Sequence, residues 1–299
     1  MKRASRFGGG GKGPVGPLTI LPQVPTPNPL SFYLAGEGVD LRSPTSPAPK
    51  NGLGGGRGGR VGSTYKKLPG PPPTSSPKPL AIVMASGGLD SCVAAAEARQ
   101  DFELAFFHGN YGQRTLIRES EAFRAQADFF KAAHRLEVDL DFLGRLGGSS
   151  LTEVDRPVPQ EESEEPGLPS TYVPFRNSVL LAAAVAWGEV LKARAIFIGA
   201  NILDNPGYPD CRPEYFRAFN RLIELGSGPE TRIKIITPLI NLNKGEIVRL
   251  GLELKAPLEL TWSCYVNDRR ACGRCSSCRL RLKGFAAAGV ADPISYEKG

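Results

Sequence analysis

The segment from Leu80 to Ser91 limits the possible folds of this chain more than any other stretch. It begins with the apolar run LAIVMA, which suits a strand buried on both faces of a parallel sheet. Ser-Gly-Gly follows at once, and the alanine-rich residues 89–100 then favour a helix. A strand that enters a helix through two glycines is the first half of a strand–helix–strand unit. The folded part of the chain is therefore expected to be an α/β protein.

The same alternation continues to residue 254. Further strands are predicted at residues 103–110, 134–140, 195–200 and 233–239, and further helices at residues 116–133, 177–192, 213–225 and 243–254. Asn177 or Ser178 could cap the helix that they begin, and Asn243 followed by Glu246 predicts a capping box. We expect a doubly wound, mostly parallel five-stranded sheet with helices on both faces.

In such a sheet a ligand lies at the carboxyl ends of the strands. Three segments stand there: residues 86–91, 108–114 and 201–212. The connection at residues 144–174 is too long for a simple link and contains QEESEEPG. It is predicted to be either a mobile lid or a disordered insertion.

Glycine and proline are concentrated ahead of this domain. Residues 1–80 hold 16 of the 35 Gly and 15 of the 27 Pro, a proportion typical of disorder. They also carry 11 Lys and Arg against two acids, whereas residues 81–299 carry 26 Lys and Arg against 28 acids. We therefore predict a disordered basic tail at residues 1–79 and one folded domain at residues 80–299. The basic charge of the whole chain is no argument for a nucleic-acid partner.

The tail lacks the apolar core of a secretory signal, and no apolar run approaches the roughly 18 residues of a membrane span. We expect no membrane partner, no stable nucleic-acid partner and a cytoplasmic location. A solvated extension, a targeting segment and a wrongly assigned start codon would each explain the tail.

Four of the six cysteines lie within 15 residues, which favours a metal site in a reducing compartment over a disulfide framework. Their spacing is C-x7-C-x2-C-x2-C, formed by Cys264, Cys272, Cys275 and Cys278. Four thiolates close a tetrahedral zinc site and leave no position for a substrate, so the predicted role is structural, in a helical segment at residues 260–285. An iron–sulfur cluster is the alternative.

The glycine turn itself has the chemistry of a phosphate site. Its backbone N–H groups are unobstructed, and the following helix offers a partial positive charge at its N-terminus. Ser86 and Ser91 could donate hydroxyl hydrogen bonds, and Asp90 could hold a magnesium ion. No Gly-Lys-Ser/Thr follows, so this is not a Walker A loop. The alternative is a tight turn that uses glycine for geometry alone.

The residues SGGLDS closely resemble the pyrophosphatase loop (PP-loop) of the ATP pyrophosphatase superfamily, whose members transfer adenylate from ATP. Further stretches resemble the 7-cyano-7-deazaguanine synthase family, and together they cover Leu80 to Pro293: YGQR (111–114), YVPFRN (172–177), GYPDCR (207–212), TPL (237–239), LTWSCY (260–265) and CGRCSSCRLRLKGF (272–285). Two positions depart from the family pattern. Thr115 stands where many relatives have His, and LDNPGYPD replaces the more usual DYSGYPD.

The resemblance implies an adenine-nucleotide α-hydrolase-like fold, a homodimer, and ATP, Mg²⁺ and Zn²⁺ as cofactors. It implies conversion of 7-carboxy-7-deazaguanine and ammonia to 7-cyano-7-deazaguanine through an activated carboxylate and an amide. It also assigns a nucleotide-binding segment: Ala85, Ser86, Gly87, Gly88, Leu89, Asp90, Ser91, Cys92, Val93, Ala94 and Ala95.

Within this interpretation, Ser86, Asp90 and Ser91 handle the phosphates and magnesium, and Arg176 or Arg114 neutralises the substrate carboxylate or the phosphate charge. For the guanine-like ring, Asp210 would bind the two adjacent N–H groups, Arg212 would orient Asp210, and Tyr208 would stack. A surface or loop ion pair is the alternative role of Arg114 and Arg176. For YPDCRPE the alternative is a Pro-bounded turn before a helix, and Tyr208 could simply pack. His108 and His134 are not expected to be catalytic.

Two rival functions remain open at this point. A PP-loop enzyme that thiolates tRNA would need a sulfur-carrying cysteine, and Cys92 and Cys211 are the only ones outside the cluster. Cys92 is expected in the core, and Cys211 is undecided. A zinc-dependent nucleic-acid-binding module would use the basic tail together with the cationic residues after the last cysteine of the cluster.

Overall fold

The computed structural model describes residues 77–160, 167–204 and 207–297. The tail predicted at residues 1–79 lies outside the described residues, except for residues 77–79. No helix in the described ranges is long and apolar enough to cross a membrane.

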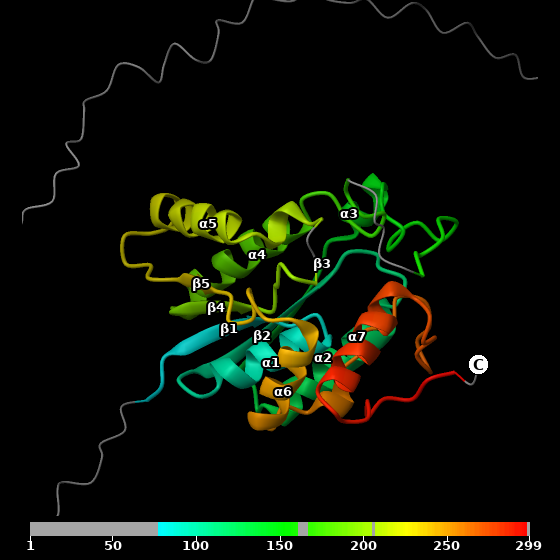
Figure 1. Cartoon of the computed structure of the whole chain (residues 1–299). Helices are drawn as coiled ribbons and strands as arrows, with labels where there is room; N and C mark the ends of the chain where they lie inside the picture. The colour runs from blue at the N-terminus through cyan, green and yellow to red at the C-terminus, as the bar shows by residue number, and fades with distance from the viewer. Residues whose placement is uncertain (1–76, 161–166, 205–206, 298–299) are drawn as a thin grey trace, which may run out of the picture. The chain divides into compact units, whose positions relative to one another are not determined.

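Five parallel strands form one sheet in the order β3-β2-β1-β4-β5 (Figure 1). Their bounds are β1 Leu80–Met84, β2 Glu103–Asn110, β3 His134–Asp139, β4 Ala195–Ile198 and β5 Lys234–Ile236. Each pair of neighbours is parallel, and β1 pairs with both β2 and β4. The strand order reverses on either side of β1, so the predicted doubly wound α/β sheet is confirmed, and a ligand site is expected where β1 ends.

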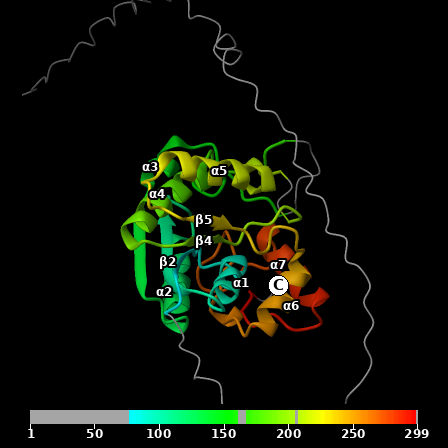
Figure 2. The ribbon, with the colours of Figure 1, turned by 90° about the vertical axis from the view of Figure 1, so that its left-hand side faces the viewer.

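Seven α-helices are described: α1 Leu89–Ala98, α2 Leu116–Phe129, α3 Asp141–Leu146, α4 Arg176–Leu191, α5 Pro213–Gly226, α6 Lys244–Glu253 and α7 Ser276–Ala287. Helices α4 and α5 cover one face of the sheet, and α1, α2, α6 and α7 lie on the other side (Figures 1 and 2). Short 3₁₀ helices stand at Pro209–Cys211 and Leu258–Leu260.

Strand β1 is buried on both faces because its side chains alternate between two cores. Ile82 and Met84 belong to the core that includes Leu181 of α4. Ala81 and Val83 belong to the opposite core, which includes residues of α1 and α2. This double burial explains the continuous apolar run in the sequence.

The capping box of α6 is confirmed. The Glu246 backbone N–H donates to Asn243 Oδ1 at 3.0 Å, and the Asn243 N–H donates to Glu246 Oε2 at 2.8 Å. The predicted cap of α4 is wrong: the helix begins at Arg176, and its N-cap residue is Phe175, with a left-handed φ of 57°. Ser178 is not free to cap because its hydroxyl bonds that of Tyr215 on α5 at 2.9 Å.

The long connection at residues 144–174 overlaps the end of α3 and is packed on both flanks. Leu151 and Val173 are buried in a cluster with Tyr111 and Leu143. The Ser150 N–H donates to the Ser170 carbonyl at 2.8 Å, which joins the two flanks. Residues 161–166, within QEESEEPG, lie outside the described residues, so the lid hypothesis is untested there.

Candidate active site

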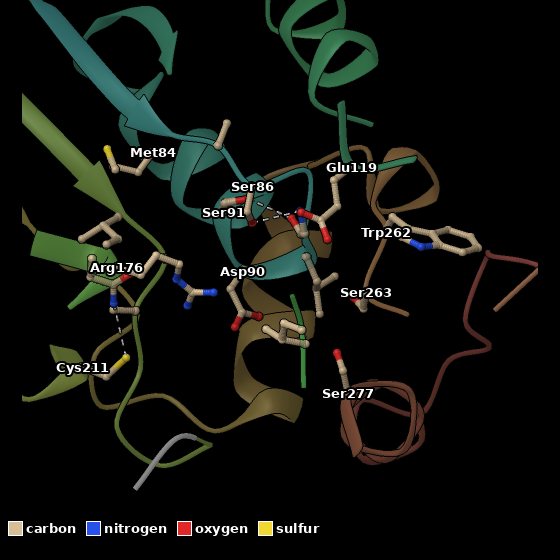
Figure 3. Close-up of a pocket in the computed structure, with 18 of the residues that line it drawn as sticks. Met84, Ser86, Asp90, Ser91, Glu119, Arg176, Cys211, Trp262, Ser263 and Ser277 are labelled. Carbon is tan, nitrogen blue, oxygen red and sulfur yellow. Dashed lines mark hydrogen bonds between the residues drawn. The ribbon is translucent and has the colours of Figure 1, made fainter. Parts of the chain in front are cut away.

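A cavity of about 340 Å³ lies where β1 gives way to α1 (Figure 3). Its wall combines the β1–α1 turn with the ends of β2 and β4, the start of α4, and residues on either side of the cysteine cluster. These segments are far apart in the sequence. They meet because the parallel sheet places the carboxyl ends of its strands at one edge. The predicted position of the ligand site is therefore the position of the cavity.

Two glycines let this turn pack tightly against its neighbours. Gly87 has a φ of +79°, and a Cβ there would stand 2.6 Å from the backbone oxygen of Glu119. A Cβ on Gly199, just after β4, would meet the backbone of Asp90 and Ser91 at 2.6 to 2.7 Å. Any larger residue at either position would push the start of α1 out of place.

The start of α1 is open to an anion. Gly88 is its N-cap residue, and no side chain caps the helix. The hydroxyls of Ser86 and Ser91 lie 3.2 Å apart at the cavity wall, and Ser91 Oγ donates to the Gly88 carbonyl at 3.1 Å. Uncapped backbone N–H groups, the helix dipole and two hydroxyls together make a site for phosphate oxygens.

The predicted nucleotide-binding segment divides in two. Ala85, Ser86, Gly88, Leu89, Asp90 and Ser91 line the cavity, whereas Gly87 packs against the backbone of Glu119 and does not line it. The second part, Cys92 to Ala95, does not: these side chains are fully buried in the core behind α1. For Cys92 the expectation of a core position is confirmed, and burial raises the pKa of its thiol. The side chains of Cys92, Val93, Ala94 and Ala95 therefore support the helix rather than touch a ligand.

Lys244, which the sequence reasoning missed, is joined to Asp90. Its Nζ lies 2.8 Å from both Asp90 carboxylate oxygens and 3.1 Å from Asp204 Oδ2. The lysine side chain is 11% exposed, and despite burial the two carboxylates raise its pKa. A buried ammonium group thus stands at the phosphate end of the cavity. It is the first residue of α6, directly after the capping residue Asn243, and this position was the available signal.

Arg176 enters the cavity from the start of α4 (Figure 3). It donates to the Tyr111 hydroxyl at 2.9 Å, and its guanidinium lies 5.1 Å from the centre of that ring. Tyr208 and Tyr265 also line the cavity and, with Tyr111, raise the pKa of Arg176 against the effect of burial. The remaining N–H groups of this permanent cation are suited to a carboxylate or phosphate.

The residues predicted for the ring are near this arginine. Asp210 is buried at 5% exposure, burial raises its pKa, and no described group bonds its Oδ1. Tyr208 lines the cavity and contacts the Thr171 hydroxyl. Arg212 is exposed and forms no described ion pair with Asp210, so its predicted orienting role does not hold in this structure.

Arg114 has a structural role in the loop, although not through the ion pair that was its alternative. It lies outside this cavity, and its guanidinium donates to backbone carbonyls of the long connection, including that of Val154 at 2.8 Å. Of the YGQR segment, only Tyr111 lines the cavity. His108 is buried, and its Nδ1 bonds the Ala85 carbonyl at 2.8 Å.

Glu119, in the first turn of α2, is a second cavity residue that the sequence reasoning missed. Its carboxylate accepts hydrogen bonds from Thr115 Oγ1 at 2.7 Å and from Gln113 Nε2 at 3.0 Å. Gln113 is part of YGQR, and the unusual Thr115 follows that motif directly.

The four clustered cysteines are buried, and their sulfurs all lie within 4.8 Å of one another. Four sulfurs about 2.3 Å from one zinc ion would lie about 3.8 Å apart, and Cys272 and Cys278 are 3.9 Å apart. Backbone N–H groups of Val266, Asn267 and Cys272 point at Cys264 Sγ within 3.4 Å. The thiols of Cys275 and Cys278, with the N–H groups of Asn267 and Cys272, lower the pKa of Cys264. The donor set fits a closed metal site.

Taken together, the described residues form a doubly wound α/β domain with an anion-binding turn and a separate four-thiol site. The family model described as "Queuosine biosynthesis protein QueC" matches residues 80–289. The chain belongs to this family.

Curated relatives agree with the family assignment. The chain is 54% identical over 218 residues to a 7-cyano-7-deazaguanine synthase of Chlorobium chlorochromatii, covering 73% of this chain and 96% of the relative. It is 53% identical, with the same coverage, to the enzyme of that name from Chlorobium luteolum. Among solved structures, NMN synthetase from Francisella tularensis is similar at a TM-score of 0.35 and 13% identity, over 62% of this chain and 64% of that chain. That likeness is too weak to support an argument.

Proposed function

We propose that this protein uses ATP to convert 7-carboxy-7-deazaguanine and ammonia into 7-cyano-7-deazaguanine. Its membership of the QueC family and its relatives named 7-cyano-7-deazaguanine synthase support this proposal. One structural observation carries it: the anion-binding turn and Arg176 open into the same cavity. A nucleotide phosphate and a substrate carboxylate can therefore meet there, which is what activation of an acid by ATP requires.

A carboxylate has no good leaving group, so activation must supply one. One carboxylate oxygen attacks the α-phosphate of ATP, pyrophosphate leaves, and an acyl adenylate forms. Ammonia displaces AMP to give the amide. The amide oxygen then attacks a second ATP in the same way, and loss of AMP and protons leaves the nitrile. The resemblance of SGGLDS to a pyrophosphatase loop favours this adenylation over phosphorylation by ATP.

The side chains of the cavity divide this work between its two ends. Ser86, Ser91 and the start of α1 bind the leaving pyrophosphate, and Lys244 neutralises part of its charge. Arg176 binds the substrate carboxylate, and Tyr208 binds the ring. Asp210 stands between the lining residues Tyr208 and Cys211 but does not itself line the cavity, so its contact with the ring stays a prediction. Magnesium, held at Asp90 or Asp204 together with the phosphates, would supply further neutralisation of phosphate charge.

The cysteine cluster would hold zinc as a structural ion. All four thiols are buried, and the four donors complete the tetrahedral coordination of zinc. Helix α7 begins at Ser276, directly after Cys275, and Ser276, Ser277 and Leu280 line the cavity. Zinc would therefore stabilise the wall of the active site without taking part in the reaction.

Sulfur transfer to RNA is not favoured by the remaining cysteines. Cys92 is in the core, and burial raises the pKa of Cys211 to about 12, so neither thiol is a ready nucleophile.

We also propose that the protein acts as a homodimer, as the family resemblance implies. Large apolar side chains are exposed on the α4–α5 layer, among them Val190, Leu222 and Leu225 at 78%, 59% and 69% exposure. Burial of these side chains in a second copy would remove apolar surface from water. Analytical ultracentrifugation of the full chain, with Leu222→Glu as the disrupting variant, tests this: a wild-type monomer at micromolar concentration would contradict it.

Incubation of the zinc-loaded protein with the carboxylate, ammonium and Mg-ATP tests the function itself. Mass spectrometry should detect the nitrile, with the amide appearing first. Carboxylate-dependent release of pyrophosphate should accompany both stages. If folded protein forms neither product, the proposed function is wrong.

A further inference from the structure

Glu119 projects from α2 into the cavity wall (Figure 3). Two donors hold its carboxylate there. Thr115 Oγ1 donates to one carboxylate oxygen at 2.7 Å, and Gln113 Nε2 donates to the other at 3.0 Å. Gln113 is itself fixed, because its Oε1 accepts the Tyr111 backbone N–H at 2.8 Å. The carboxylate is therefore preorganised, and each oxygen keeps a lone pair free.

No ion pair of this carboxylate is found in the part of the chain that the structure describes. Among the described residues, no Lys, Arg or His lies within 4 Å of it, whereas Asp90 and Asp204 share Lys244. Arg176 of α4 is the charged group that acts on it from across the cavity, and Tyr111 is the nearby titratable group. Burial raises the pKa of Glu119, and the two hydrogen bonds partly offset that effect. A desolvated, unpaired carboxylate facing a cavity is costly unless a cation visits it.

The proposed reaction supplies such a cation. Ammonia is present at neutral pH almost entirely as ammonium, which has no lone pair and cannot attack an acyl adenylate. A site for this substrate needs a carboxylate that first attracts the ammonium ion and then removes one proton from it. Lys and Arg cannot do this, and Asp90 is paired with Lys244 at the phosphate end, where magnesium would also be held.

We propose that Glu119 is the ammonium-binding residue and the general base that delivers ammonia to the activated carboxylate. The inference rests on the proposed function and deepens it. One N–H bond of ammonium breaks, and the proton moves to a Glu119 carboxylate oxygen. The nitrogen lone pair forms the C–N bond, the C–O bond to AMP breaks, and a second proton leaves the new amide for solvent.

The test compares two nucleophiles on Glu119→Gln. Hydroxylamine is largely unprotonated at neutral pH and traps acyl adenylates as hydroxamates without needing a base. With ammonium, the variant should form amide about 100-fold more slowly or worse. With hydroxylamine, and in a single turnover of carboxylate-dependent pyrophosphate release without ammonium, it should remain close to wild type. Glu121→Gln is the matched control, because Glu121 lies on the same helix with its side chain 56% exposed and should change neither rate.

The pH dependence of the rate is a second measurement. It would not change if Glu119 had only a structural role. At saturating ammonium, lowering the pH through the raised pKa of Glu119 should reduce the wild-type rate. This fall should be steeper than the fall in the fraction of free ammonia. Thr115→Val removes a hydrogen bond that lowers this pKa, so the extra acid limb should move to higher pH.

The inference would be overturned if Glu119→Gln lost activity equally with ammonium, with hydroxylamine and in pyrophosphate release. Glu119 would then serve the fold or the activation step. Unchanged use of ammonium would overturn it too. If Glu119→Gln does not fold, an unmoved profile in Thr115→Val would be decisive against it. Failure of the proposed function looks different: the wild type would then release no pyrophosphate in response to the carboxylate.

Discussion

The cysteine cluster and the phosphate end of the cavity are both groups of polar side chains, but they are built in opposite ways. All four cysteines come from 15 consecutive residues, and every thiol is buried. The phosphate end joins residues more than 150 positions apart, such as Asp90 and Lys244, and Ser86 remains exposed. A closed set of four donors suits a resident ion, whereas an open set suits a ligand that must enter and leave.

The largest effect should follow from opening the closed site. Cys278→Ala removes one of four buried thiols, and zinc binding to such sites contributes about 10–16 kcal/mol to folding. We expect loss of bound zinc and unfolding of the segment that carries α7. Metal analysis and thermal unfolding measure this. Cys211→Ala, outside the cluster, is the control that should keep its zinc; full zinc content in Cys278→Ala would contradict the four-thiol site.

The next largest effect should come from the buried cation at the open site. Lys244→Met leaves Asp90 and Asp204 facing each other without compensation, which costs about 3–5 kcal/mol when a buried pair is broken. Chemical denaturation should show this loss, and ATP turnover should fall with it. Adding Asp204→Asn should recover part of the stability. If it recovers none, the two carboxylates do not share the lysine.

Gly87→Ala should be less damaging to stability and still severe for catalysis. Alanine rarely adopts the φ of +79° found here, and its Cβ would stand 2.6 Å from a backbone oxygen. The turn would therefore be strained by about 1–3 kcal/mol. Carboxylate-dependent pyrophosphate release should report the displaced turn. Gly226→Ala is the matched control, because its Cβ would meet no atom within 4 Å. Equal behaviour of the two variants would disprove the tight fit at Gly87.

Arg176→Lys should keep the charge and lose the planar pair of donors. A hydrogen bond between charged groups contributes about 1.5–3 kcal/mol, so kcat/KM for the carboxylate should fall about 10- to 100-fold. KM for ATP should change less, because the phosphate end does not depend on this residue. Steady-state kinetics in both substrates measures the split; a larger effect on ATP would place Arg176 at the phosphates instead.

The smallest effect is expected from the cysteine in the cavity. Cys211→Ala should leave nitrile formation within about threefold of wild type, because its buried thiol, with a pKa of about 12, is neither a base nor a nucleophile. Product formation under saturating substrates checks this. Abolished turnover in a folded variant would reopen sulfur chemistry.

The fold was largely predictable because its signals are local. The apolar run before Ser86 predicted β1, and the Asn243–Glu246 spacing predicted the capping box of α6. The start of α4 was not predictable in the same way. Ser178 has the right side chain for a cap, but tertiary structure directs its hydroxyl to Tyr215.

The sequence predicted those parts of the candidate site that a single segment forms. It did not predict the parts where distant segments come together. The SGGLDS turn and the cysteine cluster each lie within one short segment of the sequence. Lys244 and Glu119 are ordinary helix residues in the sequence, and only the sheet topology shows that they line the cavity. For Arg114 the sequence suggested a site residue that the structure does not place in the cavity. It belongs to a conspicuous motif, but its guanidinium binds loop carbonyls.

The central claim is that one cavity joins an ATP phosphate to a substrate carboxylate and then to ammonia. The most direct measurement is mass spectrometry of a reaction that contains the zinc-loaded protein, 7-carboxy-7-deazaguanine, ¹⁵N-ammonium and Mg-ATP. We predict a nitrile that carries ¹⁵N, preceded by the labelled amide, with pyrophosphate released at both stages. Folded protein that consumes no ATP in response to the carboxylate, and yields no labelled product, would contradict the claim.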